Sequence, residues 1–185
     1  NTVDENEFWF FNPIIGLNID GTLAFSDVRP GTSSYSETLT VENDADLGSG
    51  VMLDMFITGT DFYDSSSSGA QCPTANQLGL SNFGYFATNG AYSTATDAEA
   101  DLVPFLDAIT ARDVDPEGYV NIQHGNAFST LLYDEAEIMQ SGPKIGGYWI
   151  ANILSPGGEM SLTFKLNLPI PCNGDFDEGS IFFFG

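Results

Sequence analysis

The chain has 185 residues, of which 42% are apolar and 13% aromatic, which is enough to build the core of one domain and too much for a disordered chain. Acidic residues number 26 against four Lys and Arg, and the formal charge of −22 excludes nucleic acid and anionic membranes as partners. Such a surface attracts cations. Two explanations of the acidic surface stay open: carboxylate clusters that hold Ca²⁺, or adaptation to a salty medium.

The first twelve residues form a distinct segment. Asn1–Asn6 is polar, Phe8, Trp9, Phe10 and Phe11 follow, and Asn12-Pro13 ends any strand. Because Glu7–Phe11 does not alternate, both of its faces require burial. Two interpretations stay open: a strand that completes a neighbour's sheet (donor-strand complementation), or a strand of its own domain. Under the first, residues 1–12 are an N-terminal extension and residues 13–185 are the folded domain.

The next third of the chain has the marks of β structure. Apolar residues from Ile14 to Phe25 are interrupted by Asp20-Gly21, which predicts a hairpin. Arg29-Pro30-Gly31 has the composition of a type II turn. Tyr35–Val41 alternates, which predicts a half-buried strand with Tyr35, Glu37, Leu39 and Val41 on one face.

Short apolar stretches continue to the end of the chain. A hairpin is predicted from Gly147–Leu154 and Met160–Leu168 across Ser155–Gly158, and Thr96–Thr110 is a short helical candidate that Pro104 limits. Further strands are predicted at 51–58, 80–87, 119–123 and 181–184, and residues 128–139 fit either a strand or a helix. Short strands and Gly/Pro turns predict an all-β jelly roll or β-sandwich, a single domain with a small helical insertion.

The two cysteines, Cys72 and Cys172, are predicted to form a disulfide, with two buried free thiols as the alternative. A bridge across about 100 residues is worth up to about 4.7 kcal/mol in the chain-entropy model. No apolar stretch approaches the length of a transmembrane helix. The chain begins at Asn1 without a hydrophobic signal region, so we expect a mature, secreted protein at the cell surface.

Catalytic motifs are missing from the sequence. His124 is the one histidine, and no nucleophile elbow, phosphate-binding loop or zinc-protease motif occurs. We therefore expect no enzymatic activity and interpret His124 as a residue at the end of a strand.

Acidic residues cluster on turns at four places, where carboxylates and backbone carbonyls together suit Ca²⁺. Two clusters are pairs, Asp44 with Asp46 and Asp61 with Asp64. The other two clusters are predicted to supply Ca²⁺ ligands: Asp113, Asp115 and Glu117, and Asp175, Asp177 and Glu178. The alternative is that these acids are solvated loop residues.

Two motifs carry a resemblance to a known family. Leu23–Gly31 reads L-A-F-S-D-V-R-P-G, and Ser36–Asn43 reads S-E-T-L-T-V-E-N. They resemble the TasA/camelysin-like superfamily of secreted jelly-roll proteins, in which a Pro-Gly turn precedes a strand that runs into Asn. The matching positions are Val28, Pro30, Gly31, Leu39, Val41 and Asn43. Leu166–Gly185 resembles the ends of archaeal members, in which a cysteine like Cys172 pairs with one like Cys72. Residues 65–117 look like an insertion.

The resemblance implies a self-assembling subunit of an extracellular filament, of the bundling-pilus, thread or cannula type, with Glu7–Phe11 (Glu7, Phe8, Trp9, Phe10 and Phe11) as donor strand and Ca²⁺ as a possible requirement. Some camelysin-like members have been described as proteases, and no residue set here supports that activity. The alternative is a secreted carbohydrate-binding or adhesive module that contacts glycans or a cell surface. It would use the aromatic residues Tyr85, Tyr92, Tyr148 or Trp149.

Overall fold

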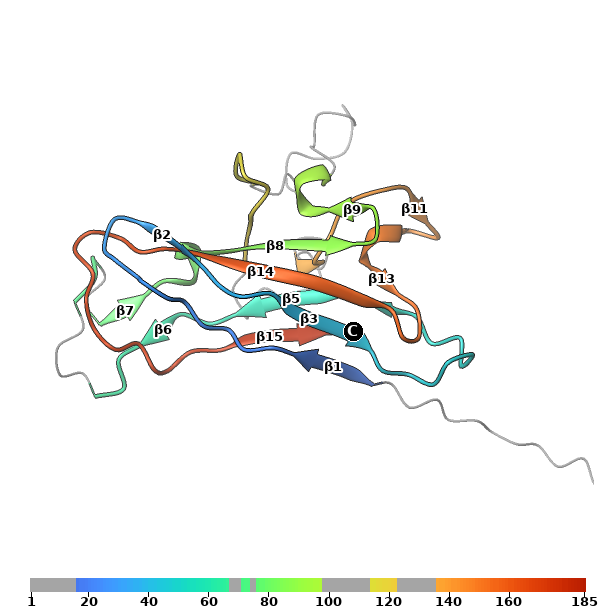
Figure 1. The fold of residues 1–185 in the computed structure, drawn as a ribbon, viewed down its shortest axis with the longest axis horizontal. Coiled ribbons are helices and arrows are strands. Elements are labelled where there is room, and N and C mark those ends of the chain that lie inside the picture. The colour runs from blue at the N-terminus through green and yellow to red at the C-terminus, as the bar shows by residue number, and fades with distance from the viewer. Residues whose placement is uncertain (1–15, 67–70, 74–75, 98–113, 123–135) are drawn as a thin grey trace, which may run out of the picture.

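The computed structural model describes residues 16–66, 71–73, 76–97, 114–122 and 136–185, and it is built from short strands (Figure 1). The strands are β1 (Leu17–Asp20), β2 (Ser33–Tyr35), β3 (Leu39–Asn43), β4 (Leu53–Asp54), β5 (Phe56–Gly59), β6 (Phe62–Tyr63), β7 (Gln77–Leu78), β8 (Phe83–Asn89), β9 (Tyr92–Ser93), β10 (Val120–Asn121), β11 (Lys144–Ile145), β12 (Tyr148–Trp149), β13 (Ile153–Leu154), β14 (Glu159–Asn167) and β15 (Ile181–Phe184). Short 3-10 turns lie at η1 (Leu80–Asn82), η2 (Thr94–Thr96) and η5 (Ile150–Asn152). The predicted all-β class is confirmed. The finer jelly-roll assignment stays a prediction, and most of the predicted helix Thr96–Thr110 lies outside the described residues.

The larger sheet is antiparallel and has the order β1-β3-β14-β8-β10, with β2 beside β14 and β9 beside β8. Strand β14 is the centre of this sheet, because β3 and β8 pair with its two edges. Its alternation is as predicted: Leu162, Phe164 and Leu166 point into the core, and Lys165 lies on the other face.

Shorter ladders, β15 with β5, β13 with β4 and β6 with β7, form the second layer. The core lies between the layers, where Met55 and Ile57 of the second layer and Val41 and Met160 of the larger sheet are each at most 1% exposed. This arrangement is a β-sandwich.

A β-bulge interrupts the predicted strand Tyr35–Val41. Tyr35 faces Lys165 and Leu39 faces Leu162, so four steps of this strand match three steps of β14. At the bulge, the amide of Phe164 donates to the hydroxyl of Ser36 instead of to a carbonyl. The prediction that Tyr35 shares a face with Leu39 is therefore wrong, since an extra residue turns the following side chains to the opposite face.

Both predicted hairpins are wrong, because the strands pair with partners far away in the sequence. Beyond Asp20-Gly21 no hairpin forms, and β1 pairs with β3. The turn at Ser155–Gly158 carries the chain from one layer to the other, since β13 pairs with β4 and β14 pairs with β3.

Pro-Gly turns form at both places where they were expected. The amide of Thr32 donates to the carbonyl of Arg29, and Gly31 has φ +79°, which completes the type II turn.

One disulfide and one buried asparagine connect parts of the fold that are distant in the sequence. Cys72 and Cys172 form the predicted disulfide. Asn43 is fully buried and its side chain donates to the carbonyls of Val51 and Leu154 and accepts from the amide of Ala45. Among the described residues, no helix is long and apolar enough to cross a membrane.

Candidate functional site

The predicted donor strand Glu7–Phe11 lies outside the described residues, as do Asp113 and His124. The chain is described from Gly16 onward, where the carbonyl of Gly16 accepts a hydrogen bond from the amide of Asp44. Residues 1–15 therefore join the domain at the end of the molecule where β1 begins and the loop after β3 lies (Figure 1).

An apolar hollow of about 600 Å³ opens at the opposite end of the sandwich, and we call it the end pocket. Its residues come from the two loops that follow β1 and β14, from β6 to β8, and from the segment after Cys172. They are Leu23, Phe25, Val28, Pro30, Phe62, Leu78, Phe83, Leu166, Leu168, Cys172, Asn173, Gly174, Asp175 and Phe176. Aromatic rings dominate it: Phe83 packs against Phe62 and Phe25, with ring centroids 4.8 and 6.0 Å away.

A second hollow of about 270 Å³, the side pocket, is lined from both layers, by β1 and β3 of the larger sheet and by β15 of the other layer. It shares Leu23 and Phe62 with the end pocket, so the two hollows adjoin, and we refer to them together as the groove. Its residues are Ile19, Leu23, Leu39, Phe62, Phe164, Gly179, Ser180, Ile181 and Phe183. Ile19 is 46% exposed, so this part of the core is open to solvent.

Two walls of the side pocket, β1 and β15, are edge strands of their sheets. In the described part of the chain, β1 pairs only with β3, and β15 pairs only with β5. An edge strand presents backbone N–H and C=O groups that can pair with an added strand. The groove therefore combines an apolar floor with two strand edges, which is the chemistry that an extended apolar peptide needs.

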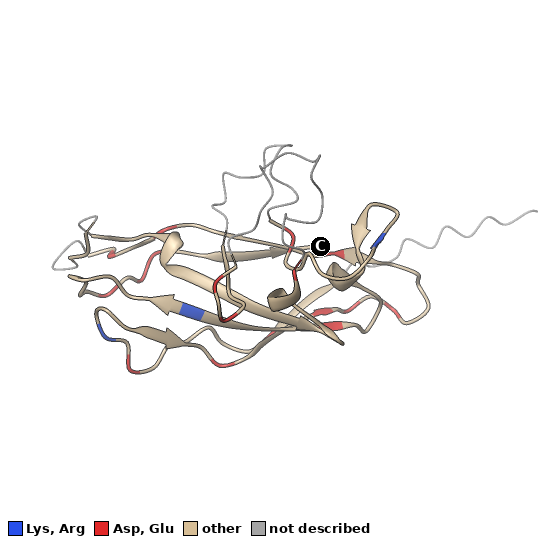
Figure 2. Cartoon of the chain, turned by 90° about the horizontal axis from the view of Figure 1, so that it is seen from above, with Lys and Arg blue, Asp and Glu red and all other residues tan. Residues whose placement is uncertain are grey.

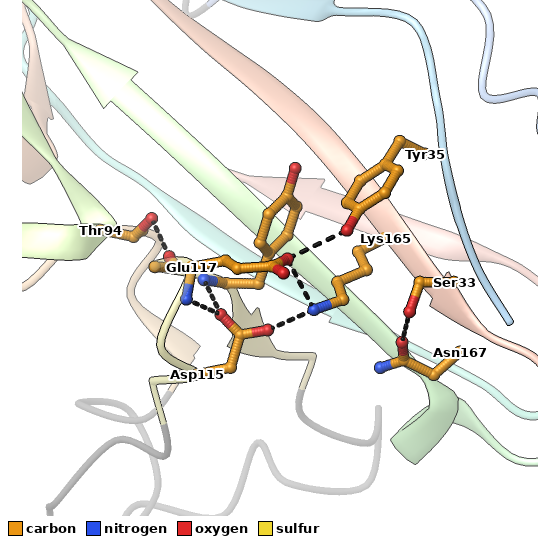
Figure 3. Close-up of polar contacts among 9 residues, drawn as sticks. Ser33, Tyr35, Thr94, Asp115, Glu117, Lys165 and Asn167 are labelled. Carbon is orange, nitrogen blue, oxygen red and sulfur yellow. Dashed lines mark hydrogen bonds and ion pairs between the residues drawn. The ribbon is translucent and has the colours of Figure 1, made fainter.

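Asp115 and Glu117, two of the predicted Ca²⁺ ligands, both contact Lys165 (Figure 3). Lys165 Nζ lies 2.7 Å from Asp115 Oδ2 and 2.9 Å from Glu117 Oε2, and it lies over the ring of Tyr119. Tyr35 donates to the same Glu117 oxygen. Asp115 Oδ1 accepts from the amides of Glu117 and Tyr119, so this carboxylate also shapes the turn.

The electrostatics of this cluster follow from its hydrogen bonds. Burial raises the pKa of Asp115, but hydrogen bonds from Lys165 and two backbone amides outweigh it, and the net pKa is lowered. The pKa of Glu117 is lowered by the hydrogen bonds from Lys165 and Tyr35. The bonds to both carboxylates raise the pKa of Lys165 despite its burial. The cluster fastens the turn after Val114 to the outer face of the larger sheet.

The other predicted cluster lies beside the end pocket. Asp175 lines that pocket, and the backbone of Glu178 pairs with Tyr63. Asp177 accepts bonds from the amide and hydroxyl of Ser65, at 2.8 and 2.6 Å, which lower the pKa of Asp177. Within the described ranges no group of three or more His, Cys, Asp or Glu side chains is arranged to hold a metal ion. The Ca²⁺ site stays a prediction.

The aromatic residues suggested for glycan contact fall into two groups. Tyr85 is 1% exposed and donates to the carbonyl of Ile138, so its assignment as an exposed binding residue is wrong: it belongs to the core. Tyr148 is 54% exposed on the β11–β12 hairpin, next to Trp149, whose ring is covered by Lys144. Tyr92 is half-buried.

No family model and no curated protein matches this sequence. The groove and its two strand edges were not foreseen from the sequence. The sequence signals were Ile181–Phe184 and the apolar residues near Ile19, but nothing in the local pattern indicates that these two strands are neighbours.

Proposed function

We propose that this protein is a structural subunit of an extracellular filament, pilus or tube. The subunits join head to tail, and Glu7–Phe11 of one copy enters the groove of the next. The observation that carries the proposal is the open apolar groove between the edges of β1 and β15. The disulfide is compatible with an extracellular location.

The groove and the donor segment match in chemistry. In an extended strand, successive side chains alternate, so Phe8 and Phe10 would share one face, and Trp9 and Phe11 the other. A fully buried aromatic side chain contributes about 1.5–3 kcal/mol, and each net backbone hydrogen bond adds about 1 kcal/mol. Two aromatic residues in the groove would contribute about 3–6 kcal/mol, and the ladder bonds would add to it, against a cost of association of about 4–15 kcal/mol.

The positions of the donor and the groove favour a head-to-tail polymer. The donor segment joins the domain at Gly16, whereas the end pocket lies at the far end of β14. A contact between different surfaces of two copies repeats without closing, which produces fibres.

The test is a mixing experiment with two variants of the full chain. Phe10→Asp places a charge on the donor strand, and Ile181→Asp places one in the groove. We expect neither variant to form filaments in negative-stain electron microscopy, and a mixture of the two to form heterodimers in sedimentation. Thr2→Asp is the matched control, because it adds the same charge to the polar part of the segment, and it should polymerise like the parent chain.

Trp9 gives an independent readout. In a Trp149→Phe variant, Trp9 is the sole tryptophan, and burial in the groove should shift its emission to the blue as filaments form. If Phe10→Asp polymerises normally, or if the parent chain is monomeric with Trp9 already buried, Glu7–Phe11 is an internal strand and the proposal is wrong.

Calcium belongs to the proposal as a stabilising ligand. The Asp175, Asp177 and Glu178 turn borders the end pocket, where a bound cation would reduce repulsion between copies. Electron microscopy with Ca²⁺ and with a chelator tests this role: filaments of equal length in both conditions would argue against it.

A carbohydrate-binding or adhesive module is the second candidate, and the exposed Tyr148 beside Trp149 favours it. Sugars that stack on this hairpin should quench Trp149 emission, and Tyr148→Ala should weaken the response. A lack of quenching across a broad glycan panel would count against this function.

A further inference from the structure

Opposite ends of the molecule carry surfaces of opposite character. Strand β14 runs from Glu159, which faces Glu42, to Asn167, which faces Ser33. These eight steps separate the ends by about 27 Å. The loop after β3 lies at the first end, and the type II turn at Pro30 lies at the second (Figure 1).

The second end carries an exposed cation, and we call Val28, Arg29 and Ile170 the arginine tip. Arg29 is exposed, and within the described ranges its side chain has no ion pair. Val28 and Ile170 are 38% and 71% exposed, and the side chain of Ile170 lies against Gly31 of the turn. The tip is thus a charge within an apolar patch on a rigid turn.

Basic residues are scarce enough to make this position informative (Figure 2). The chain has four: Arg29, Arg112, Lys144 and Lys165. Lys165 is held by two carboxylates, Lys144 covers the Trp149 ring, and Arg112 lies outside the described residues.

The first end carries the complementary surface, and we call Asp44, Asp46, Leu47 and Met52 the acidic loop. Both carboxylates are exposed, and Leu47 and Met52 are 84% and 55% exposed. The base of this loop is fixed, because the side chain of Asn43 bonds the amide of Ala45 and the carbonyl of Val51. The acidic loop thus exposes two apolar side chains beside two carboxylates, the counterpart of the charge and apolar side chains of the arginine tip.

We propose that the arginine tip of one copy docks on the acidic loop of the next copy, so that this contact adds to strand insertion and orients the subunits. The inference rests on the proposed function. A donor segment leaves its domain beside Asp44, and the groove proposed to receive it reaches the end pocket, which is lined by Val28 and Pro30. Insertion therefore brings the acidic loop of the donor copy to the arginine tip of the acceptor copy.

Charge reversal tests the contact in the full chain. Arg29→Glu and Asp46→Arg should each raise the critical concentration for polymerisation about threefold to tenfold, because an attraction becomes a repulsion. The double variant, which restores opposite charges, should return to within about twofold of the parent chain. Lys144→Glu is the matched control, since it changes the net charge equally at another exposed basic residue, and it should have less effect than Arg29→Glu.

A crosslink tests the geometry. Val28→Cys with Leu47→Cys should give a ladder of disulfide-linked oligomers upon oxidation of filaments, and Asn121→Cys with Leu47→Cys should give none. If filaments form but Arg29→Glu matches Lys144→Glu, or the double variant shows no recovery, or the ladder is missing, the docking contact is wrong and strand insertion stands. If the parent chain does not polymerise, both proposals fail.

Discussion

Replacement of the buried Asn43 should cost a large part of the stability of this domain. Its side chain makes three hydrogen bonds, of 3.0, 2.9 and 3.1 Å, to Val51, Leu154 and Ala45. Asn43→Ala leaves two carbonyls and one amide without this partner. At about 1 kcal/mol for each bond, and more for a group that stays dry, we expect a loss of about 2–4 kcal/mol. For a chain of this size, that lowers Tm by about 5–15 °C.

Urea unfolding of the full chain, followed by tryptophan fluorescence, measures this loss as a lower midpoint at constant slope. Asn18→Ala is the matched control, because Asn18 is exposed and makes one long bond to Glu42, and it should change stability by less than about 0.5 kcal/mol. Asn43→Asp should be at least as harmful as Asn43→Ala at neutral pH, since a carboxylate cannot donate to either carbonyl. A loss below about 1 kcal/mol in Asn43→Ala would refute the idea that this side chain holds the two layers together.

Three further predictions concern the Lys165 cluster and the disulfide. Lys165→Met should destabilise the fold by about 1–2 kcal/mol. This is less than the cost of breaking a fully buried ion pair, because the side chains of Asp115 and Glu117 are 30% and 55% exposed and can be hydrated. Chemical denaturation measures the loss, and an unchanged midpoint would contradict the prediction. The lowered pKa values of Asp115 and Glu117 give stability that is present above their unfolded pKa values and is lost as the pH falls through the folded ones. The raised pKa of Lys165 gives stability that is complete below about pH 10, near its unfolded pKa, and is lost as the pH rises through the folded pKa. Melting from pH 2 to 7 should show the acid loss reduced in Lys165→Met, and identical acid profiles would contradict the assignment. Substitution of Cys72 and Cys172 by Ser should cost about 2–4 kcal/mol, because the bridge spans 100 residues; an unchanged Tm would show that it constrains little.

Local chemistry explains which parts of the fold were predicted. Turns such as Arg29–Thr32 depend on the φ preferences of Pro and Gly, which act within four residues. The alternation in β14 reflects a strand with the core on one face. The disulfide followed from the even number of cysteines and their surroundings.

Long-range pairing explains what was missed. Asp20-Gly21 is a good hairpin dipeptide, but β1 gains more by pairing with β3, whose buried Val41 and Leu39 anchor the sheet. The bulge at Ser36 adds one residue, and an alternating pattern cannot reveal where a register slips. The ion pair between Lys165 and Asp115 was not foreseen either, because 50 positions separate the two residues.

The groove shows why a site between sheets resists sequence analysis. Its walls, β1 and β15, are separated by the 160 residues 21–180, and the short sequence of each strand does not show that the other lies beside it. The groove is a candidate site because, in the described part of the chain, no strand pairs with the outer edges of β1 and β15. Ile19, which lies on β1 and lines the groove, is exposed. The apolar pattern of a sequence predicts which face of a strand is buried. It does not show whether the outer edge of an edge strand pairs with the same chain or with another copy. That distinction depends on Glu7–Phe11, and the mixing of donor and groove variants separates the two cases because only pairing between copies can produce a heterodimer.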